Sequence, residues 1–206
     1  MFAIGHFGIS YLIGKTSSQL LDINLNLGLL FSISVLPDID LLLFSFVNHR
    51  GPLHSIIFSL IVCLPFFITY QQKVFPYFFA LLSHSLIGDI FSGGLQLFWP
   101  FSTNWVYVLD FPVRGSISVA MEFIIFIVTV LIIIVSKDYQ KLLFDRTRRF
   151  YWFIPFGAVL IPLLSTFGNY ANLPFLLVGP SLFYLVLFSY LLIGSKFNLK
   201  KREGHV

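Results

Sequence analysis

Residues 116–135 form a run of twenty residues that holds a single ionisable side chain, Glu122. About twenty apolar residues, rising about 1.5 Å each, cross the hydrocarbon core of a bilayer as a helix. Similar runs cover much of the chain, which is 57% hydrophobic and only 11% charged over 206 residues. Because soluble domains carry about a quarter charged residues, the sequence predicts an all-α, polytopic integral membrane bundle of about six to seven helices.

The apolar runs also predict where these helices lie. We expect a short segment at 2–14, which crosses the membrane only if it continues or tilts, and a brief apolar piece at 41–47. With no repeat or linker visible, we expect a single membrane domain over 1–206, with scaffold helices and a basic tail at 126–206. The longer predicted helices are 20–37, 56–70 (with Ser55 as N-cap), 74–93, 116–135, 150–167 and 173–194.

The lysines and arginines predict the orientation of the chain. They gather in the loop after residue 135 and in the tail, whereas the turn at 168–174 has no charge. The positive-inside rule therefore predicts a cytoplasmic C-terminus, which places Lys15 and Lys73 inside and Arg114 and the turn 49–54 outside. Because the basic residues lie in short loops and the tail, the net charge of +4 does not suggest nucleic-acid binding.

A dense polar cluster interrupts the apolar sequence at Leu36-Pro-Asp-Ile-Asp40 and His49-Arg-Gly-Pro-Leu-His-Ser55. An ionisable group inside a membrane costs a few kcal/mol, so such a cluster needs a functional explanation. The predicted orientation brings further imidazoles and carboxylates to the same outer depth of the bilayer. The inventory is His6, Asp38, Asp40, His49, His54, His84, Asp89 and Glu122.

Carboxylate oxygens and neutral imidazoles are the ligands that divalent metals take in proteins. The inventory suits one or two ions, with zinc as the first choice and manganese or magnesium as alternatives. We expect Arg50 to bind a phosphate group and Glu122 or Asp40 to accept a proton. The predicted metal ligands are His6, Asp38, Asp40, His49, His54, His84 and Asp89.

Each of these residues also has a structural explanation. Asp38 and Asp40 could cap a helical piece, His49 could be solvated, and His54 could be a polar residue ahead of a helix. His84 could bond a backbone carbonyl, and Glu122 could pair with Arg114. All of these structural explanations would have to be true together. We consider this less favourable than a functional site, because each buried charge costs free energy of its own.

The spacing of His84 and Asp89 raises a question of geometry. Residues five apart point about 140° apart on a regular α-helix, so the two would not share a face. Gly88 suggests a π-bulge that would bring them together. Without such a distortion, only one would bind the metal and the other would orient it. The pair Gly93-Gly94 should then end the helix and let Leu95–Phe101 turn across the mouth of the site.

Taken in order, several motifs resemble the membrane-bound metal-dependent hydrolase family of bacteria and archaea, some members of which are regulated by the SOS repressor LexA. They are Gly5-His6, Leu36-Pro-Asp-Ile-Asp40, His49-Arg-Gly-Pro-Leu-His-Ser55, Ser83-His84 with Gly88-Asp89, and Trp99-Pro-Phe101. The resemblance covers 1–125 and implies a polytopic membrane hydrolase with its metal site in that part. More loosely, the ligand types are similar to those of zinc-dependent phospholipase C. Leu53 stands where threonine is expected, and the His84–Asp89 spacing is one residue longer than the usual one.

The residues and the resemblance together predict a metal-dependent hydrolase in the cell membrane, with its site toward the extracytoplasmic side. Its expected partner is a membrane lipid, and its substrate a phosphoester or other ester of a lipid-like or small molecule. The alternative is a metal-ion or proton-coupled transporter, which should carry polar residues in both halves of the membrane and often inverted repeats. A non-catalytic assembly protein would need bases to pair with the acids, and too few intramembrane bases exist.

Overall fold

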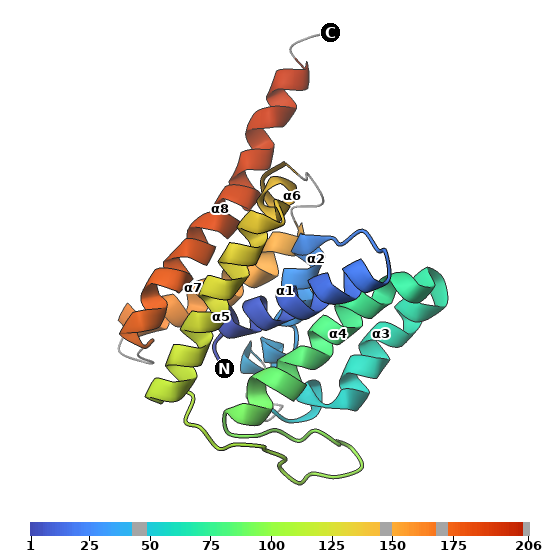
Figure 1. Cartoon of the computed structure of the whole chain (residues 1–206), viewed down its shortest axis with the longest axis vertical. Helices are drawn as coiled ribbons and strands as arrows, with labels where there is room; N and C mark the ends of the chain where they lie inside the picture. The colour runs from blue at the N-terminus through green and yellow to red at the C-terminus, as the bar shows by residue number, and fades with distance from the viewer. Residues whose placement is uncertain (43–48, 145–149, 168–172, 204–206) are drawn as a thin grey trace.

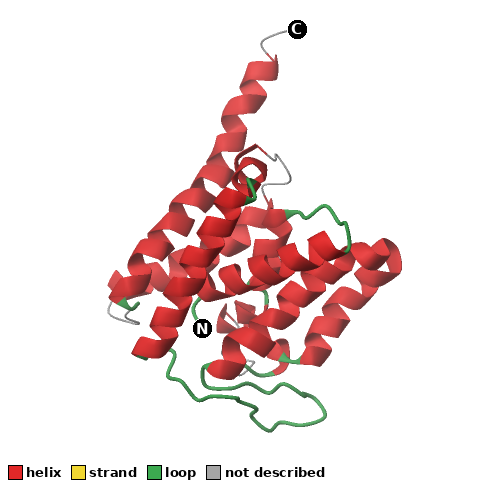
Figure 2. Cartoon of the chain, viewed as in Figure 1, coloured by secondary structure: helices red, strands yellow, loops and turns green. Residues whose placement is uncertain are grey.

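The computed structural model describes residues 1–42, 49–144, 150–167 and 173–203, although it leaves the side chains near the two ends of some of these ranges undescribed. These residues are helical or in loops, with two isolated β-bridges and no strand (Figure 2). The predicted all-α membrane bundle is confirmed. The α-helices are α1 (Ala3–Leu20), α2 (Leu27–Ser34), α3 (Ile56–Tyr70), α4 (Phe75–Ser83), α5 (Ser116–Val135), α6 (Asp138–Phe144), α7 (Phe150–Phe167) and α8 (Phe175–Glu203).

Among the described residues, three helical stretches are long and apolar enough to cross a membrane, namely Ile56–Phe91, Ser116–Val135 and Phe175–Ile193. The first of them folds back on itself at η3 (Gln71–Val74), where Gln71 has a positive φ of 49°, so that α3 and α4 run antiparallel (Figure 1). A shorter apolar helix covers Phe150–Thr166. The bounds expected for α3, α5 and α7 agree with those of the structure.

Helix α1 lies in the middle of the bundle, between the α3–α4 pair and the crossing helices α5 and α8 (Figure 1). It packs against α2, α4, α5, α7 and α8. Phe7 and Tyr11 on α1 are fully buried, and Phe7 meets Phe31 of α2 and Tyr184 and Phe188 of α8. The first half of α1, Ile4–Tyr11, is buried on all its faces, which explains why it holds small residues as well as large ones, whereas Gln19 and Leu20 at its end are exposed.

The predicted helix at 20–37 is wrong. Residues 21–26 form a turn in which Asp22 has a φ of 52°, and Asn26 then caps the short α2 by accepting a hydrogen bond from the Leu29 N–H at 2.9 Å. The apolar segment 2–14 instead extends to Leu20 as α1. Most of the expected piece 41–47 lies outside the described residues.

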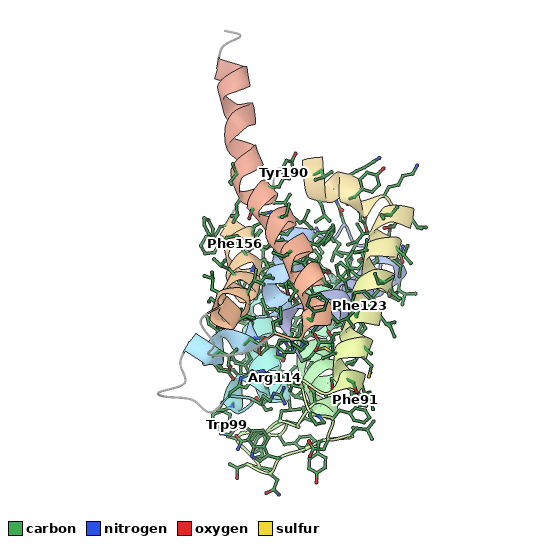
Figure 3. The ribbon with its side chains drawn as sticks, turned by 90° about the vertical axis from the view of Figure 1, so that its left-hand side faces the viewer. Phe91, Trp99, Arg114, Phe123, Phe156 and Tyr190 are labelled. Atoms are coloured by element: carbon green, nitrogen blue, oxygen red, sulfur yellow. The ribbon has the colours of Figure 1, made fainter. Side chains whose placement is uncertain are left out.

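The two ends of the bundle differ in their polar groups. At one end, Lys15 of α1 pairs with Asp138 of α6, and the Tyr11 O–H donates to the same carboxylate at 2.9 Å. At the other end lies the long loop 92–115, and Figure 3 places Trp99 and Arg114 there, far from Tyr190 on α8. The structure therefore places Lys15 and Arg114 at opposite ends of the bundle, as the charge pattern expects.

Candidate metal centre

The segment that follows α2 carries the two aspartates of the first motif. It forms the 3-10 helix η1 (Pro37–Leu42), whose tight turns place Asp40 in the interior with no exposed surface. The Asp40 carboxylate organises the turn that follows. Its Oδ2 accepts a hydrogen bond from the Arg50 backbone N–H at 3.0 Å, and its Oδ1 lies 2.9 Å from Nδ1 of His49. Arg50 has a φ of 61°, a strained conformation that this bond supports.

A short 3-10 helix, η2 (Pro52–His54), then carries His54 into the interior. The expected cap at Ser55 is confirmed, because its Oγ accepts a hydrogen bond from the Phe58 N–H at 3.0 Å. His54 therefore stands at a fixed point just before α3. Its Nδ1 lies 3.2 Å from Asp40 Oδ2, and its Nε2 lies on the other side of the ring, near Asp38 and Asp89.

The π-bulge suggested by Gly88 is present. Residues His84–Gly88 (η4) form a π-helix after α4, and Asp89–Phe91 (η5) continue it as a 3-10 helix. The wider turn brings the two side chains onto one side, so that His84 Nε2 lies 3.4 Å from Asp89 Oδ2. Despite their five-residue spacing, His84 and Asp89 therefore direct their side chains to the same point.

Two groups of potential ligands meet at this point, and Asp38 belongs to both. In each group one donor atom per residue lies within 4.8 Å of all the others. Between them they bring together all seven residues that the sequence predicts as metal ligands. The first group is His6, Asp38, His84 and Asp89, and the second is Asp38, Asp40, His49 and His54.

The protonation state of His84 can be assigned from its partner. Its Nδ1 lies 2.7 Å from the backbone carbonyl oxygen of Ser34, which can only accept a hydrogen bond. Nδ1 therefore carries a hydrogen, and Nε2 is the ring nitrogen that faces the site. A backbone carbonyl behind the ring is the usual support of a metal-bound histidine.

His6 provides a test of whether a metal fits. Its side chain is fully buried, and neither ring nitrogen has a hydrogen-bond partner. Asp89 Oδ2 is likewise buried without one. A buried polar group without a partner costs about 1–3 kcal/mol. His6 stacks on His84 with ring centres 3.6 Å apart, and its Nε2 lies 3.7 Å from Asp89 Oδ1, so a cation among these atoms would satisfy all three residues.

The charge of the site also favours a cation. Burial raises the pKa of Asp40, but the hydrogen bond from His49 and the proximity of His54 outweigh it and hold that pKa below its usual range. Burial lowers the pKa of His54, but the carboxylates of Asp38, Asp40 and Asp89 outweigh it and hold that pKa well above its usual range. Three carboxylates thus create a field that attracts either protons or a metal ion.

Arg50 lies at the edge of the site. Its Nη2 is 3.3 Å from Asp89 Oδ1, and its Nη1 donates to the backbone oxygen of Ser92. The amino group of Met1 also approaches Asp89 Oδ1, at 3.0 Å. The loop after η5 crosses this region as expected, because the Gln96 N–H donates to the Arg50 backbone oxygen at 2.9 Å. Arg50 is therefore a nearly buried cation beside the ligand groups.

Glu122 lies outside both ligand groups. It is fully buried on α5, and its carboxylate accepts hydrogen bonds from the Phe2 backbone N–H at 3.0 and 3.2 Å. The alternative pairing with Arg114 is absent from the ion pairs of the described residues. Glu122 thus stays available for a role other than holding a metal.

Comparison with protein families decides the membership of this chain. Residues 1–194 match the YdjM inner membrane protein family. The chain belongs to that family. Comparison with curated proteins and with solved structures gave no match. The match extends past residue 125, beyond the motifs on which the sequence resemblance rests, and it supports a membrane location for the chain.

Some features of the site in this YdjM-family chain carry no signal that sequence reasoning could use. The Ser34 carbonyl that supports His84 is a backbone atom, and any residue could supply it. Ser92 contacts Arg50 through its carbonyl, and its Oγ donates to the Gly88 carbonyl at 3.3 Å. The sequence did indicate one backbone feature of the site, the π-bulge that Gly88 suggests.

Proposed function

We propose that this chain is a membrane-embedded, metal-dependent hydrolase that cleaves a phosphoester or related ester bond of a lipid-like substrate. The observation that carries the proposal is the position of Asp38. Its Oδ1 lies 3.5 Å from Nε2 of His84 and 3.5 Å from Nε2 of His54, and these histidines belong to separate ligand groups. A carboxylate shared between two groups is typical of paired-metal sites.

Zinc is the metal that this mixture of imidazoles and carboxylates favours, with manganese and magnesium as alternatives. His6, His84 and Asp89 would hold one ion and His49 and His54 the other, with Asp38 between them. Two ions held there would supply an activated water and would stabilise charge on the attacking and the leaving oxygen. Asp40, which contacts both His49 and His54, would act as their positioning residue or as a further ligand.

The remaining residues suit the other tasks of the reaction. Arg50 can bind a phosphate oxygen, because a guanidinium donates from several N–H groups in a fixed plane. Glu122 is a carboxylate outside the ligand groups and is suited to accept a proton, a task that the sequence also allows for Asp40. Burial among membrane helices suits an amphiphilic substrate that arrives from the bilayer.

A transporter is the weaker candidate. In the described residues the polar groups at the far end of α1 are paired with one another, since Lys15 and Lys141 both lie against Asp138. An aspartate that is paired in this way suits a structural anchor between α1 and α6 better than a step in an ion path.

The experiment is metal analysis of the purified protein, followed by hydrolysis assays on a series of lipid phosphoesters with and without chelator. We expect stoichiometric metal in the wild type, the loss of one ion in His84→Ala, because His84 belongs to one ligand group, and chelator-sensitive hydrolysis. Asp22→Asn is the matched control, because Asp22 is exposed and asparagine tolerates its positive φ. A metal-free wild type, or an His84→Ala variant with unchanged metal, would overturn the proposal.

A further inference from the structure

An apolar groove of about 340 Å³ lies between α1, the irregular helices η4 and η5, and α5. This volume is within the range of small-molecule sites, about 300–1,000 Å³. The wall is almost entirely apolar and is formed in part by two of the stretches that are able to cross a membrane. It is lined by Met1, Ile9, Leu12, Ile13, Ile87, Gly88, Phe91, Ser92, Phe111, Ser118, Met121, Glu122 and Ile125.

One end of the groove adjoins the candidate metal centre. Gly88 lines it and also contacts the ring of His6, while Ser92 lines it and bonds Arg50 through its carbonyl. Glu122, the carboxylate outside the ligand groups, lines it as well. Polar groups that can act on a substrate therefore gather at this end.

The other end is purely apolar and lies farther along α1. Ile9, Leu12 and Ile13 line it at the spacing of one helix face on α1. Ile13 is seven residues from His6, which is about 10 Å along the helix axis. Ile87 and Met121, each 41% exposed, flank the groove on the surface that membrane helices present to lipid. Figure 3 shows Phe91, another lining residue, near the lower end of α5.

We propose that this groove binds one acyl chain of a phosphate-bearing membrane lipid and so places the phosphate beside Arg50 and the ligand groups. The inference rests on the proposed function and names its class of substrate. Three features support it: the groove is polar at one end only, its wall is formed in part by two stretches that are able to cross a membrane, and its polar end adjoins the candidate site.

The chemistry of the lining distinguishes a lipid from a partner helix as the occupant. The wall is apolar except near Ser92 and Glu122, which matches an amphiphile with one apolar chain and one polar group. Ile87 and Met121 are partly exposed beside it, on the face that meets lipid. The occupant that the groove suits is thus a lipid already present in the bilayer at this depth.

Photocrosslinking in nanodiscs tests the proposal without relying on turnover. The probe is phosphatidic acid with a diazirine near the end of one acyl chain, and labelled residues are mapped by mass spectrometry. We expect labels on Ile9, Ile13 and Ile125, and a several-fold loss of these labels in Met121→Trp, whose indole would narrow the groove. Ile124→Trp is the matched control, because Ile124 is exposed on the same helix but does not line the groove.

Two further measurements sharpen the result. Ile13→Trp, at the apolar end of the groove, should shift the labelled positions toward the polar end. This variant keeps the test valid even if Met121→Trp fails to fold. Unlabelled phosphatidic acid should compete better than diacylglycerol with the same chains, because only the former offers a phosphate to Arg50. Equal competition would overturn the phosphate assignment. Labels spread evenly over the outer face of α5 would overturn the groove assignment. So would a groove that stays unlabelled because a second protein chain, labelled in its place, covers it.

This test separates the inference from the proposed function. Labelling does not require a metal. Specific labelling of a protein that binds no metal would therefore support the lipid groove and contradict the proposed hydrolase function. Conversely, if the protein is a metal-dependent hydrolase but neither groove substitution changes its labelling, the proposed function stands and the lipid groove is wrong.

Discussion

The imidazole of His6 occupies the space that a side chain at Gly88 would fill. A Cβ atom built on Gly88 would lie 2.4 Å from His6 Cε1 and 2.6 Å from its Nδ1, well inside van der Waals contact. His6 and Gly88 come from helices far apart in the sequence, and the π-helix that ends at Gly88 makes their approach possible. The glycine thus sets the position of a potential metal ligand.

Gly88→Ala should displace His6 from the ligand group. We expect the added methyl to destabilise the protein by about 1–3 kcal/mol, as overpacking of a filled interior does, and to reduce the bound metal. Thermal unfolding in detergent and metal analysis measure the two effects. The matched control is Gly157→Ala, since a Cβ at Gly157 meets nothing within 4 Å. Full metal content in Gly88→Ala would show that His6 is not a ligand.

The sharing of Asp38 predicts a pattern of metal loss. Asp38→Ala should remove both ions, because this carboxylate belongs to both ligand groups. His6→Ala and His49→Ala should each weaken one ion and leave the other, since each histidine belongs to one group. Metal-to-protein ratios of the three variants, measured by mass spectrometry, check the prediction, with Asp22→Asn as the control. If His6→Ala and His49→Ala both lost all metal, the two groups would form one site.

Much of the site was predictable because its residues are costly in an apolar chain. Asp89 and Glu122 stood out for that reason, whereas His6 was the weakest of the predicted ligands. The glycine at position 88 indicated the π-bulge that brings His84 and Asp89 together. The helix bounds of α3 and α5 followed from the length of their apolar runs and from the Ser55 cap.

The errors have an equally physical origin. The run 20–37 is apolar enough for a long helix, but the left-handed conformation at Asp22 and the cap at Asn26 shorten it to eight residues. Both are local hydrogen-bonding effects that a hydropathy pattern cannot detect. Similarly, α1 continues past residue 14 into polar sequence, where Lys15 pairs with Asp138. These two residues are 123 positions apart, so a local pattern does not indicate the contact.

The orientation of the bundle leads to a labelling prediction. In a Cys63→Ala background, Asn104→Cys should react with a membrane-impermeant maleimide added outside intact cells, and Lys137→Cys should react only after lysis. Cys63 is buried, so its removal clears the background with a small packing change. The reason is the excess of basic residues after α5, which by the positive-inside rule predicts a cytoplasmic location for that end. The reverse labelling pattern would place the candidate site on the cytoplasmic side.

The anchor between α1 and α6 predicts how stability depends on pH. Burial raises the pKa of Asp138, but Lys15, the Tyr11 hydroxyl and Lys141 outweigh it and hold that pKa below its usual value of about 4. A carboxyl whose pKa is lowered by folding stabilises the protein above its ordinary pKa, and this contribution disappears as the pH falls through the lowered one.

Asp138→Asn should therefore cost about 1–3 kcal/mol near pH 7, and this difference from wild type should shrink toward zero below about pH 4. Thermal unfolding of both proteins in detergent between pH 3 and 8 measures it. Asp110→Asn, at an exposed carboxylate of the long loop, is the control and should change stability little at any pH. A difference between wild type and Asp138→Asn that stays constant over the whole pH range would mean that Asp138 anchors α6 without its charge.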